Sequence, residues 1–383
     1  MTADPAEVPA LTADPAEVLA LTADPAEAPA PAGPGVPVTA AAPAPALAAD
    51  PVTAAAPALV REWLAPFPLD VPLTLSVHRR GGGDPAYRVD AAGAVWRTSL
   101  TPDGPGTVRV RSRRTRTVTG SAMTGTAVTG MVVTGSAVTG MVVTGEAWGP
   151  GAGWLLDRLP AQLGFHDDRA GFTARHPVVG ELALRYEGLR VGRSGRVFEA
   201  LVPAVLEQKV VGREAHRAWR YLLGKFGTAA PGPVPGGMRV FPAPRTWARI
   251  PSWDWHRAGV EGVRARTIIT AAAVATRLEQ ALEEDPAEAD RRLRSLPGIG
   301  VWTSAEIRQR AMGDPDAVSV GDYHLPNAVG WTLAQRTTDD DGMLELLAPY
   351  TGHRYRVTRL IELGGSRPPR RGPRMPVRDY REF

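Results

Sequence analysis

Apolar and polar residues alternate through much of the N-terminal half of the chain and recur with helical spacing in the C-terminal half. The segments FPLDVPLTLSV, AVWRTSLTP and GTVRVRSRR alternate in this way, which predicts strands of an antiparallel sheet. TGEAWGPGAGWLLDRLPAQLG then predicts a further strand followed by a helix. We therefore expect an α+β domain over residues 60–192.

From about Gly192 the apolar residues recur every three or four positions, the period of a helix with one buried face. The stretch VFEALVPAVLEQKVVGREAHRAWRYLLGKFG predicts two helices separated near Val211–Gly212. Three more helices are predicted by SWDWHRAG, RARTIITAAAVATRLEQAL and PAEADRRLRSL. We therefore expect an all-α domain over residues 193–366.

Two stretches repeat a short motif instead of following either period. MTADPAEVPA, LTADPAEVLA and LTADPAEAPA open an Ala/Pro-rich segment whose composition cannot bury enough surface to offset the entropy of ordering. We expect residues 1–59 to be disordered, either as a tether for a partner or, as we favour, as a repeat expansion without function. A five-residue repeat ending in Thr-Gly, at about 118–145, predicts a loop inserted between two strands, either floppy or a ragged hairpin.

Composition narrows the chemistry that the chain can perform. Its 383 residues carry a formal net charge of +4 at pH 7, which permits nucleic-acid binding without requiring it. The basic tail, residues 367–383, is either a phosphate-binding arm or a solvated end. The absence of cysteine excludes disulfides, thiolate metal sites, an iron–sulfur cluster and a cysteine nucleophile. With no long apolar run and an acidic rather than basic N-terminus, we expect a cytoplasmic protein.

The stretch LPGIGVWTSAEIRQRAMG predicts the end of one helix, a tight hairpin and a second helix. Pro297 cannot continue the first helix because it lacks an N–H, and Gly298 and Gly300 allow backbone angles closed to other residues. Thr303 and Glu306 have the spacing of a capping box at the start of the second helix. The free N–H groups there would bind a phosphate of a DNA backbone without reading its sequence.

The second helix should end near Met312–Gly313, and Asp322 follows Gly300 by 22 residues (322 − 300). In this spacing, in LPGIGVWT and in FEALVPAVLEQKV, the chain resembles the helix-hairpin-helix–Gly/Pro–Asp DNA glycosylases, and more narrowly the 3-methyladenine DNA glycosylase II branch. The resemblance covers roughly Phe67 to Gly365 without the Thr-Gly insertion. It implies that the sheet is a TATA-binding-protein-like domain, followed by an all-α helix-hairpin-helix glycosylase domain.

The resemblance also implies roles for individual residues. Asp322 would be the catalytic carboxylate, which faces the sugar of a flipped-out nucleotide, stabilises an oxocarbenium-like transition state and orients or deprotonates water. Capping of the following helix is the alternative interpretation of the same residue. The DNA-binding positions would be Pro297, Gly298, Ile299, Gly300, Thr303, Gln208 and Lys209. The base pocket would be lined by Trp302, Glu306, Tyr323, His324 and His353.

Some of these positions depart from the family pattern. Lys209 stands where the branch often has an apolar wedge that fills the gap left by the flipped base, so the neighbouring Gln208 could take that role. Trp302 replaces the lysine nucleophile of lyase-active relatives, which predicts a monofunctional enzyme with water as nucleophile. We expect its indole to pack in the core. Glu306 stands at an aromatic pocket position, and His353 where a stacking Trp occurs.

Together these features imply a DNA glycosylase of base-excision repair that releases alkylated purines of the 3-methyladenine type from duplex DNA. Such a base is already positively charged and leaves without a strong general acid. A noncatalytic DNA-binding protein of the same fold, and a glycosylase for an oxidised or deaminated base, are the alternatives. We expect a nucleoid-associated monomer without a cofactor or metal centre, apart from a structural monovalent cation at the DNA-bound hairpin. Trp253 and Trp255 should pack in the core, or stack on DNA if exposed.

Overall fold

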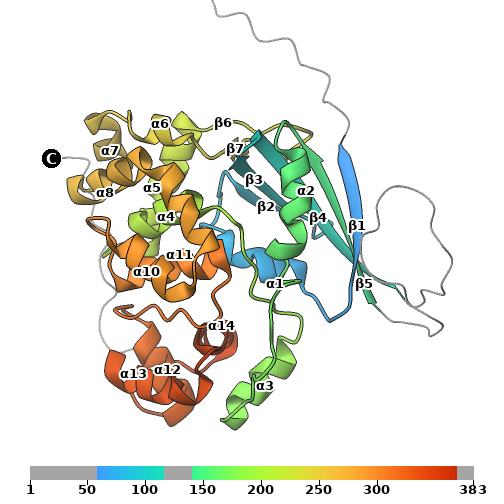
Figure 1. Cartoon of the computed structure of the whole chain (residues 1–383), viewed down its shortest axis with the longest axis vertical. Coiled ribbons are helices and arrows are strands. Elements are labelled where there is room, and N and C mark those ends of the chain that lie inside the picture. Colours follow the sequence, from blue (N-terminus) through green and yellow to red (C-terminus); the bar gives the residue numbers. More distant parts are fainter. Residues whose placement is uncertain (1–57, 116–139, 369–383) are drawn as a thin grey trace, which may run out of the picture. The chain divides into compact units, whose positions relative to one another are not determined.

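The computed structural model describes residues 58–115 and 140–368 (Figure 1). The Ala/Pro-rich repeat, most of the Thr-Gly repeat and almost all of the basic tail lie outside these described residues. Among the helices that the structure describes, none is long and apolar enough to cross a bilayer.

The N-terminal part is a five-stranded sheet in which every neighbouring pair of strands is antiparallel. Its spatial order is β1-β5-β4-β3-β2, so β1 and β2 are the edges. The strands predicted over AVWRTSLTP, GTVRVRSRR and the start of TGEAWG are confirmed as β3, β4 and β5. The strand bounds are β1 Leu59–Ala65, β2 Tyr87–Val89, β3 Val95–Thr101, β4 Gly104–Thr115 and β5 Gly140–Trp148.

The strand predicted over FPLDVPLTLSV is wrong. This segment forms the short helix α1, Val71–Leu75, and a 3-10 turn, Ser76–His78. Asp70 caps the helix by accepting the N–H of Leu73 at 2.9 Å, and Pro72 occupies its first turn, where a missing N–H costs nothing. These local start signals outweigh the alternation of apolar residues.

At the C-terminal end of the insertion predicted at about 118–145, residues 140–145 belong to β5, which pairs antiparallel with β4 as in the hairpin alternative. Val143 is fully buried in the sheet core. Gly145 lies directly under a helix, because a Cβ there would stand 2.6 Å from Cδ2 of Leu159. The repeat therefore supplies a strand residue and a contact glycine to the packed domain.

Helix α2, Ala152–Gln162, covers one face of the sheet and confirms the predicted helix (Figure 1). Period-two alternation along the strands turns a set of small apolar residues toward it. The buried cluster between helix and sheet contains Val95, Val108, Val110, Val143, Ala147, Leu155, Leu156 and Leu159.

The C-terminal part is predominantly helical, as predicted, with one small hairpin of strands β6 and β7. The predicted helix over residues 264–282 is broken at Val274, whose φ of −117° and ψ of 18° interrupt it. The bounds are α3 Pro177–Arg185, α4 Val197–Leu206, α5 Gly212–Phe226, β6 Thr228–Ala229, β7 Arg239–Val240, α6 Pro244–Trp247, α7 Ser252–Ala258, α8 Gly262–Ala273, α9 Ala275–Glu279, α10 Pro286–Arg294, α11 Val301–Ile307, α12 Leu325–Ala334, α13 Asp340–Leu347 and α14 Arg354–Gly364.

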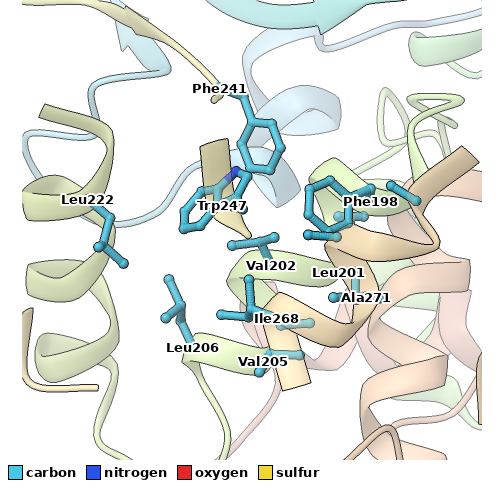
Figure 2. Packing of buried hydrophobic residues seen from close by; sticks show 14 of the residues in the cluster. Phe198, Leu201, Val202, Val205, Leu206, Leu222, Phe241, Trp247, Ile268 and Ala271 are labelled. Atoms are coloured by element: carbon cyan, nitrogen blue, oxygen red, sulfur yellow. The ribbon is translucent and has the colours of Figure 1, made fainter. Parts of the chain in front are cut away.

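Helix α4 is the centre of this part, with α5, α8 and α11 packed around it. Figure 2 shows Phe198, Leu201 and Val202 of α4 among Trp247 of α6 and side chains of α8. An apolar helix of this kind is buried on all sides. Trp255 belongs to this core, as expected, whereas the expectation is wrong for Trp253, which is 63% exposed.

A separate cluster holds α12, α13 and α14 together (Figure 1). Val329 of α12, Leu347 of α13 and Val357 of α14 are fully buried in it. Asp322 lies in the loop that enters α12, so this cluster fixes the far side of the candidate site.

Candidate active site

The predicted helix, hairpin and helix are confirmed as α10, the turn at residues 295–300 and α11. Gly298 has a φ of +88°, and a Cβ there would stand 2.1 Å from Oγ1 of Thr267 in α8. Only glycine fits both constraints. Gly300 is different, because its φ is −93° and its Cβ direction is open, so the expectation that it needs a special backbone angle is wrong.

The hairpin presents backbone rather than side chains to solvent. Pro297, Gly298 and Gly300 are exposed, while the side chain of Ile299 is buried in the main core. In the described part of the chain, the N–H groups of residues 300–303 have no hydrogen-bond acceptor. The helix continues after α11 as a π-helical turn, Arg308–Met312, and ends at Gly313 as predicted. The unbonded N–H groups of residues 300–303 can bind an anion.

The predicted capping box is wrong. The N-cap of α11 is Gly300, so Thr303 lies inside the first turn and is only 2% exposed. The hydroxyl of Thr303 instead accepts a hydrogen bond from the amide of Gln208 at 2.8 Å. Glu306 is turned into the interior, where its carboxylate accepts a bond from Ser319.

Gln208 fastens the end of α4 to the hairpin. Besides Thr303, its Nε2 donates to the carbonyl oxygen of Gly298 at 2.9 Å. The next residue, Lys209, is exposed and has a φ of +54°, in the left-handed region that non-glycine residues rarely adopt. Within the described residues its ammonium group has no ion-pair partner. The structure thus holds a free cation beside the hairpin.

Asp322 is half-buried, and donors hold both of its carboxylate oxygens. Oδ1 accepts the backbone N–H groups of His324 at 2.8 Å and of Leu325 at 2.9 Å, at the start of α12. Oδ2 accepts the indole N–H of Trp302 at 3.1 Å. The carboxylate therefore bonds to the backbone at the start of α12, although the N-cap residue of that helix is His324. Trp302 is half-buried beside Asp322 rather than packed in a core cluster, so that expectation is wrong.

The loop before Asp322 is held on both sides. Gly321, with a φ of +88°, donates its N–H to both carboxylate oxygens of Asp340 at 3.0 and 3.1 Å. The N–H of Asp322 itself donates to the carbonyl oxygen of Ser319 at 3.2 Å. Gly321 thereby ties the loop to α13, and Ser319 ties it to the interior beside Glu306 of α11.

Comparison with known proteins agrees with this geometry. No protein-family model matches the chain. A Mycobacterium tuberculosis protein named "probable bifunctional transcriptional activator/DNA repair enzyme AlkA" is 32% identical over 142 residues, 36% of this chain and 28% of that protein. The chain thus matches less than a third of the length of this relative.

Two solved structures are similar over most of the chain. A 3-methyladenine DNA glycosylase from Archaeoglobus fulgidus superposes with a TM-score of 0.59 and 17% identity, over 79% of this chain and 97% of that one. An 8-oxoguanine glycosylase/lyase from Clostridium acetobutylicum, in complex with double-stranded DNA, superposes with a TM-score of 0.54 and 13% identity, over 77% and 91%. The chain has the helix-hairpin-helix DNA glycosylase fold. The resemblance inferred from the hairpin and its spacing to Asp322 is thereby confirmed.

The remaining residues that were predicted to line a base pocket divide into two groups. Tyr323 is 76% exposed, and its ring meets that of His324 edge-on with centroids 4.8 Å apart, so both lie beside Asp322 at the surface. The ring of His353 has its contacts elsewhere. Its Nε2 lies 3.1 Å from the carbonyl oxygen of Ala170, and its ring meets that of Phe172.

Some residues that support the candidate site carry no signal in the sequence. Thr267 and Asp340 contact the hairpin and the Asp322 loop only because distant segments meet in the fold. No motif spacing connects them to residues 296–322. Among the described residues, no three His, Cys, Asp or Glu side chains gather in a group that could hold a metal ion.

Proposed function

We propose that this chain is a DNA glycosylase of base-excision repair that hydrolyses the N-glycosidic bond of alkylated purines, of the 3-methyladenine type, in duplex DNA. The observation that carries the proposal is the half-buried carboxylate of Asp322, held by three N–H donors next to a hairpin whose backbone is free to bind phosphate. A carboxylate needs such fixed geometry to act on a transient charge.

DNA binding begins at the hairpin. The backbone of residues 297–300 and the first N–H groups of α11 contact phosphates, with Thr303 and Gln208 bracing the turn from below. Lys209 adds a positive charge to the same surface. Either Lys209 or Gln208 fills the gap that the flipped nucleotide leaves in the duplex. The antiparallel sheet is the counterpart of the TATA-binding-protein-like domain. The binding partner in this proposal is duplex DNA that contains a damaged base. The chain acts as a monomer, and it acts at the nucleoid.

Base release then depends on Asp322. With one oxygen occupied by the start of α12 and the other by Trp302, the carboxylate keeps a fixed direction toward the extruded sugar. Its negative charge stabilises the oxocarbenium-like transition state and orients the attacking water. An N-alkylated purine carries a positive charge before it leaves, so the site needs no strong acid. The exposed rings of Tyr323 and His324 are positioned to contact the base.

We further propose that base release proceeds with water and without lyase chemistry. An amine nucleophile is needed for a Schiff base. Position 302, where lyase-active relatives carry their lysine, holds an indole whose N–H is bonded to Asp322. Of the two lysines in the sequence, Lys225 is bonded to Asp254, and Lys209 lies just beyond the end of α4 and not on α11. Borohydride reduction with abasic DNA should therefore leave little covalent complex, and a stable adduct in high yield would contradict this assignment.

The decisive experiment measures release of free base from methylated duplex DNA by the unaltered chain, Asp322→Asn and Asp339→Asn. Asp339 is the matched control, because its carboxylate accepts a backbone N–H at the start of α13, as that of Asp322 does at the start of α12. We expect 3-methyladenine or 7-methylguanine release that collapses only in Asp322→Asn, with DNA binding retained. Tight binding without base release by the unaltered chain would select the noncatalytic DNA-binding function. Release of an oxidised or deaminated base instead would change the substrate class.

A further inference from the structure

A buried polar network lies behind the loop that carries Asp322. Oε1 of Glu306 accepts the hydroxyl of Ser319 at 2.6 Å, and Oε2 pairs with Arg310 at 2.7 Å. Gln309 donates from its amide to the Ser319 hydroxyl and to the carbonyl oxygen of Ala317, both at 2.9 Å. Ser319 is 4% exposed, Gln309 5% and Glu306 9%, so these bonds are shielded from water.

The network reaches Asp322 through the backbone of Ser319. The carbonyl oxygen of Ser319 accepts the N–H of Asp322, while its hydroxyl is the group that Glu306 holds. On the opposite side, Arg310 donates from Nε to the carbonyl oxygen of Val77 at 3.1 Å, in the turn after α1. A continuous set of polar contacts therefore joins the Asp322 loop to α11 and to the N-terminal part.

Trp302 and Glu306 stand four residues apart, so they lie on the same face of α11. Trp302 bonds to the carboxylate of Asp322 directly. Glu306 restrains the backbone of the same residue through Ser319. Residues on one face of α11 therefore contact Asp322 in two ways: Glu306 acts on its backbone position, and Trp302 acts on the direction of its carboxylate.

A buried carboxylate is costly unless it is paired and fully hydrogen-bonded, and its placement then limits the conformations that its neighbours can adopt. Glu306 meets both conditions, because each of its oxygens has a partner. A cap on α11 or a surface contact would not require an interior acid at this position.

We propose that Glu306 is a positioning residue that sets the backbone of Asp322 through Ser319, in place of lining the base pocket. The inference rests on the proposed function of Asp322, and it adds the residue that holds Asp322 in place. Losing the link lets the 319–322 loop shift, and displacement of a reacting group by about 1 Å can lower a rate by about 100-fold.

The test compares Ser319→Ala with Ser304→Ala. Ser304 is a matched control, because it is fully buried and its hydroxyl donates to a carboxylate, that of Asp290, at 2.7 Å. Among the residues that the structure describes, no hydrogen bond or ion pair joins Ser304 or Asp290 to the Asp322 loop. Single-turnover base release, DNA affinity and the indole N–H resonance of Trp302, assigned by its loss in Trp302→Phe, are measured for each variant.

For Ser319→Ala we expect single-turnover release to fall by about 10- to 100-fold while DNA affinity is kept. The Trp302 resonance should move, and Ser304→Ala should leave both the rate and the resonance unchanged. Glu306→Gln, which keeps an acceptor for Ser319, should lose less activity than Glu306→Ala. Thermal unfolding identifies variants that fail to fold. If the Glu306 variants fail, Ser319→Ala carries the test, and if Ser319→Ala fails, Glu306→Gln carries it.

An unchanged rate and an unchanged Trp302 resonance in Ser319→Ala would overturn the inference. Equal losses in Ser319→Ala and Ser304→Ala would also overturn it, because they would indicate general loosening of α11. If the unaltered chain releases no base, the proposed function fails by itself. The Trp302 resonance then still decides the positioning, since it reports the Asp322 contact without any turnover.

Discussion

Gly298 of the hairpin lies directly against Thr267 of α8, so close that a Cβ on the glycine would stand 2.1 Å from the threonine Oγ1. Helix α8 is itself packed on the central helix α4. The turn that we assign to phosphate binding is therefore seated on the main core. Its shape is set by packing as well as by the backbone freedom of glycine.

Gly298→Ala should destabilise the chain and weaken DNA binding. The substitution adds a clash with Thr267 and places a non-glycine residue at a φ of +88°, which together should cost at least about 1–3 kcal/mol. Gly300→Ala is the control, because its φ of −93° and open Cβ direction predict little change in stability. Urea unfolding and DNA titration measure both effects. Equal stability losses in the two variants would contradict this account of the hairpin.

Replacement of Lys209 should separate backbone strain from charge. Lys209→Gly removes the cost of a left-handed non-glycine residue and should raise the free energy of unfolding by about 1 kcal/mol, whereas Lys209→Ala keeps that cost. Both variants lose the cation. We expect weaker DNA binding in each variant. The slope of log K for DNA binding against log salt concentration should be smaller in magnitude by about one. An unchanged salt slope would remove Lys209 from the DNA interface.

Trp302→Phe should slow base release while sparing DNA binding. The substitution keeps an aromatic ring but removes the N–H that donates to Oδ2 of Asp322. A hydrogen bond to a charged group contributes about 1.5–3 kcal/mol, so the single-turnover rate should fall by about 10- to 100-fold. Trp253→Phe, at an exposed indole, is the control for the rate. A rate equal to that of the unaltered chain would show that this bond does not orient the carboxylate.

The stability of the chain should depend on pH through His78. Its ring lines a cavity of about 30 Å³ together with Arg80, Arg97, Arg310 and Glu199. Burial, and then the positive charges of Arg97, Arg310 and Arg80, lower the pKa of His78 well below its ordinary value. The unfolded chain therefore takes up this proton first, and stability is lost as the pH falls below about 6.5. Glu199 acts in the opposite direction, because burial raises its pKa.

His78→Gln isolates this contribution from that of Glu199. The free energy of unfolding of the unaltered chain should fall relative to the variant by up to about 1.4 kcal/mol per pH unit below pH about 6.5. Urea unfolding at a series of pH values measures the difference. Parallel pH profiles for the two chains would mean that His78 accepts a proton in the folded state as easily as in the unfolded one.

Periodicity and local turn chemistry predicted much of the fold. The apolar spacing in VFEALVPAVLEQKV, the alternation in AVWRTSLTP, and Pro297 with Gly298 are all local patterns, and the structure has α4, β3 and the hairpin there. Asp322 was identified through the family resemblance that its spacing to the hairpin carries. Where local signals disagreed, as between alternation and the Asp70 cap before α1, the cap prevailed.

The contacts that define the site were beyond any local pattern. Nothing near Trp302 in the sequence indicates that its indole bonds to Asp322, and nothing near Glu306 indicates that its carboxylate is buried against Ser319. A side chain's period along a helix tells which face it occupies, but its partner comes from another segment whose approach depends on the packing of the whole core. Residue type and spacing therefore identified the groups that could act, and tertiary packing decided which of them are exposed beside the hairpin and which support the exposed ones.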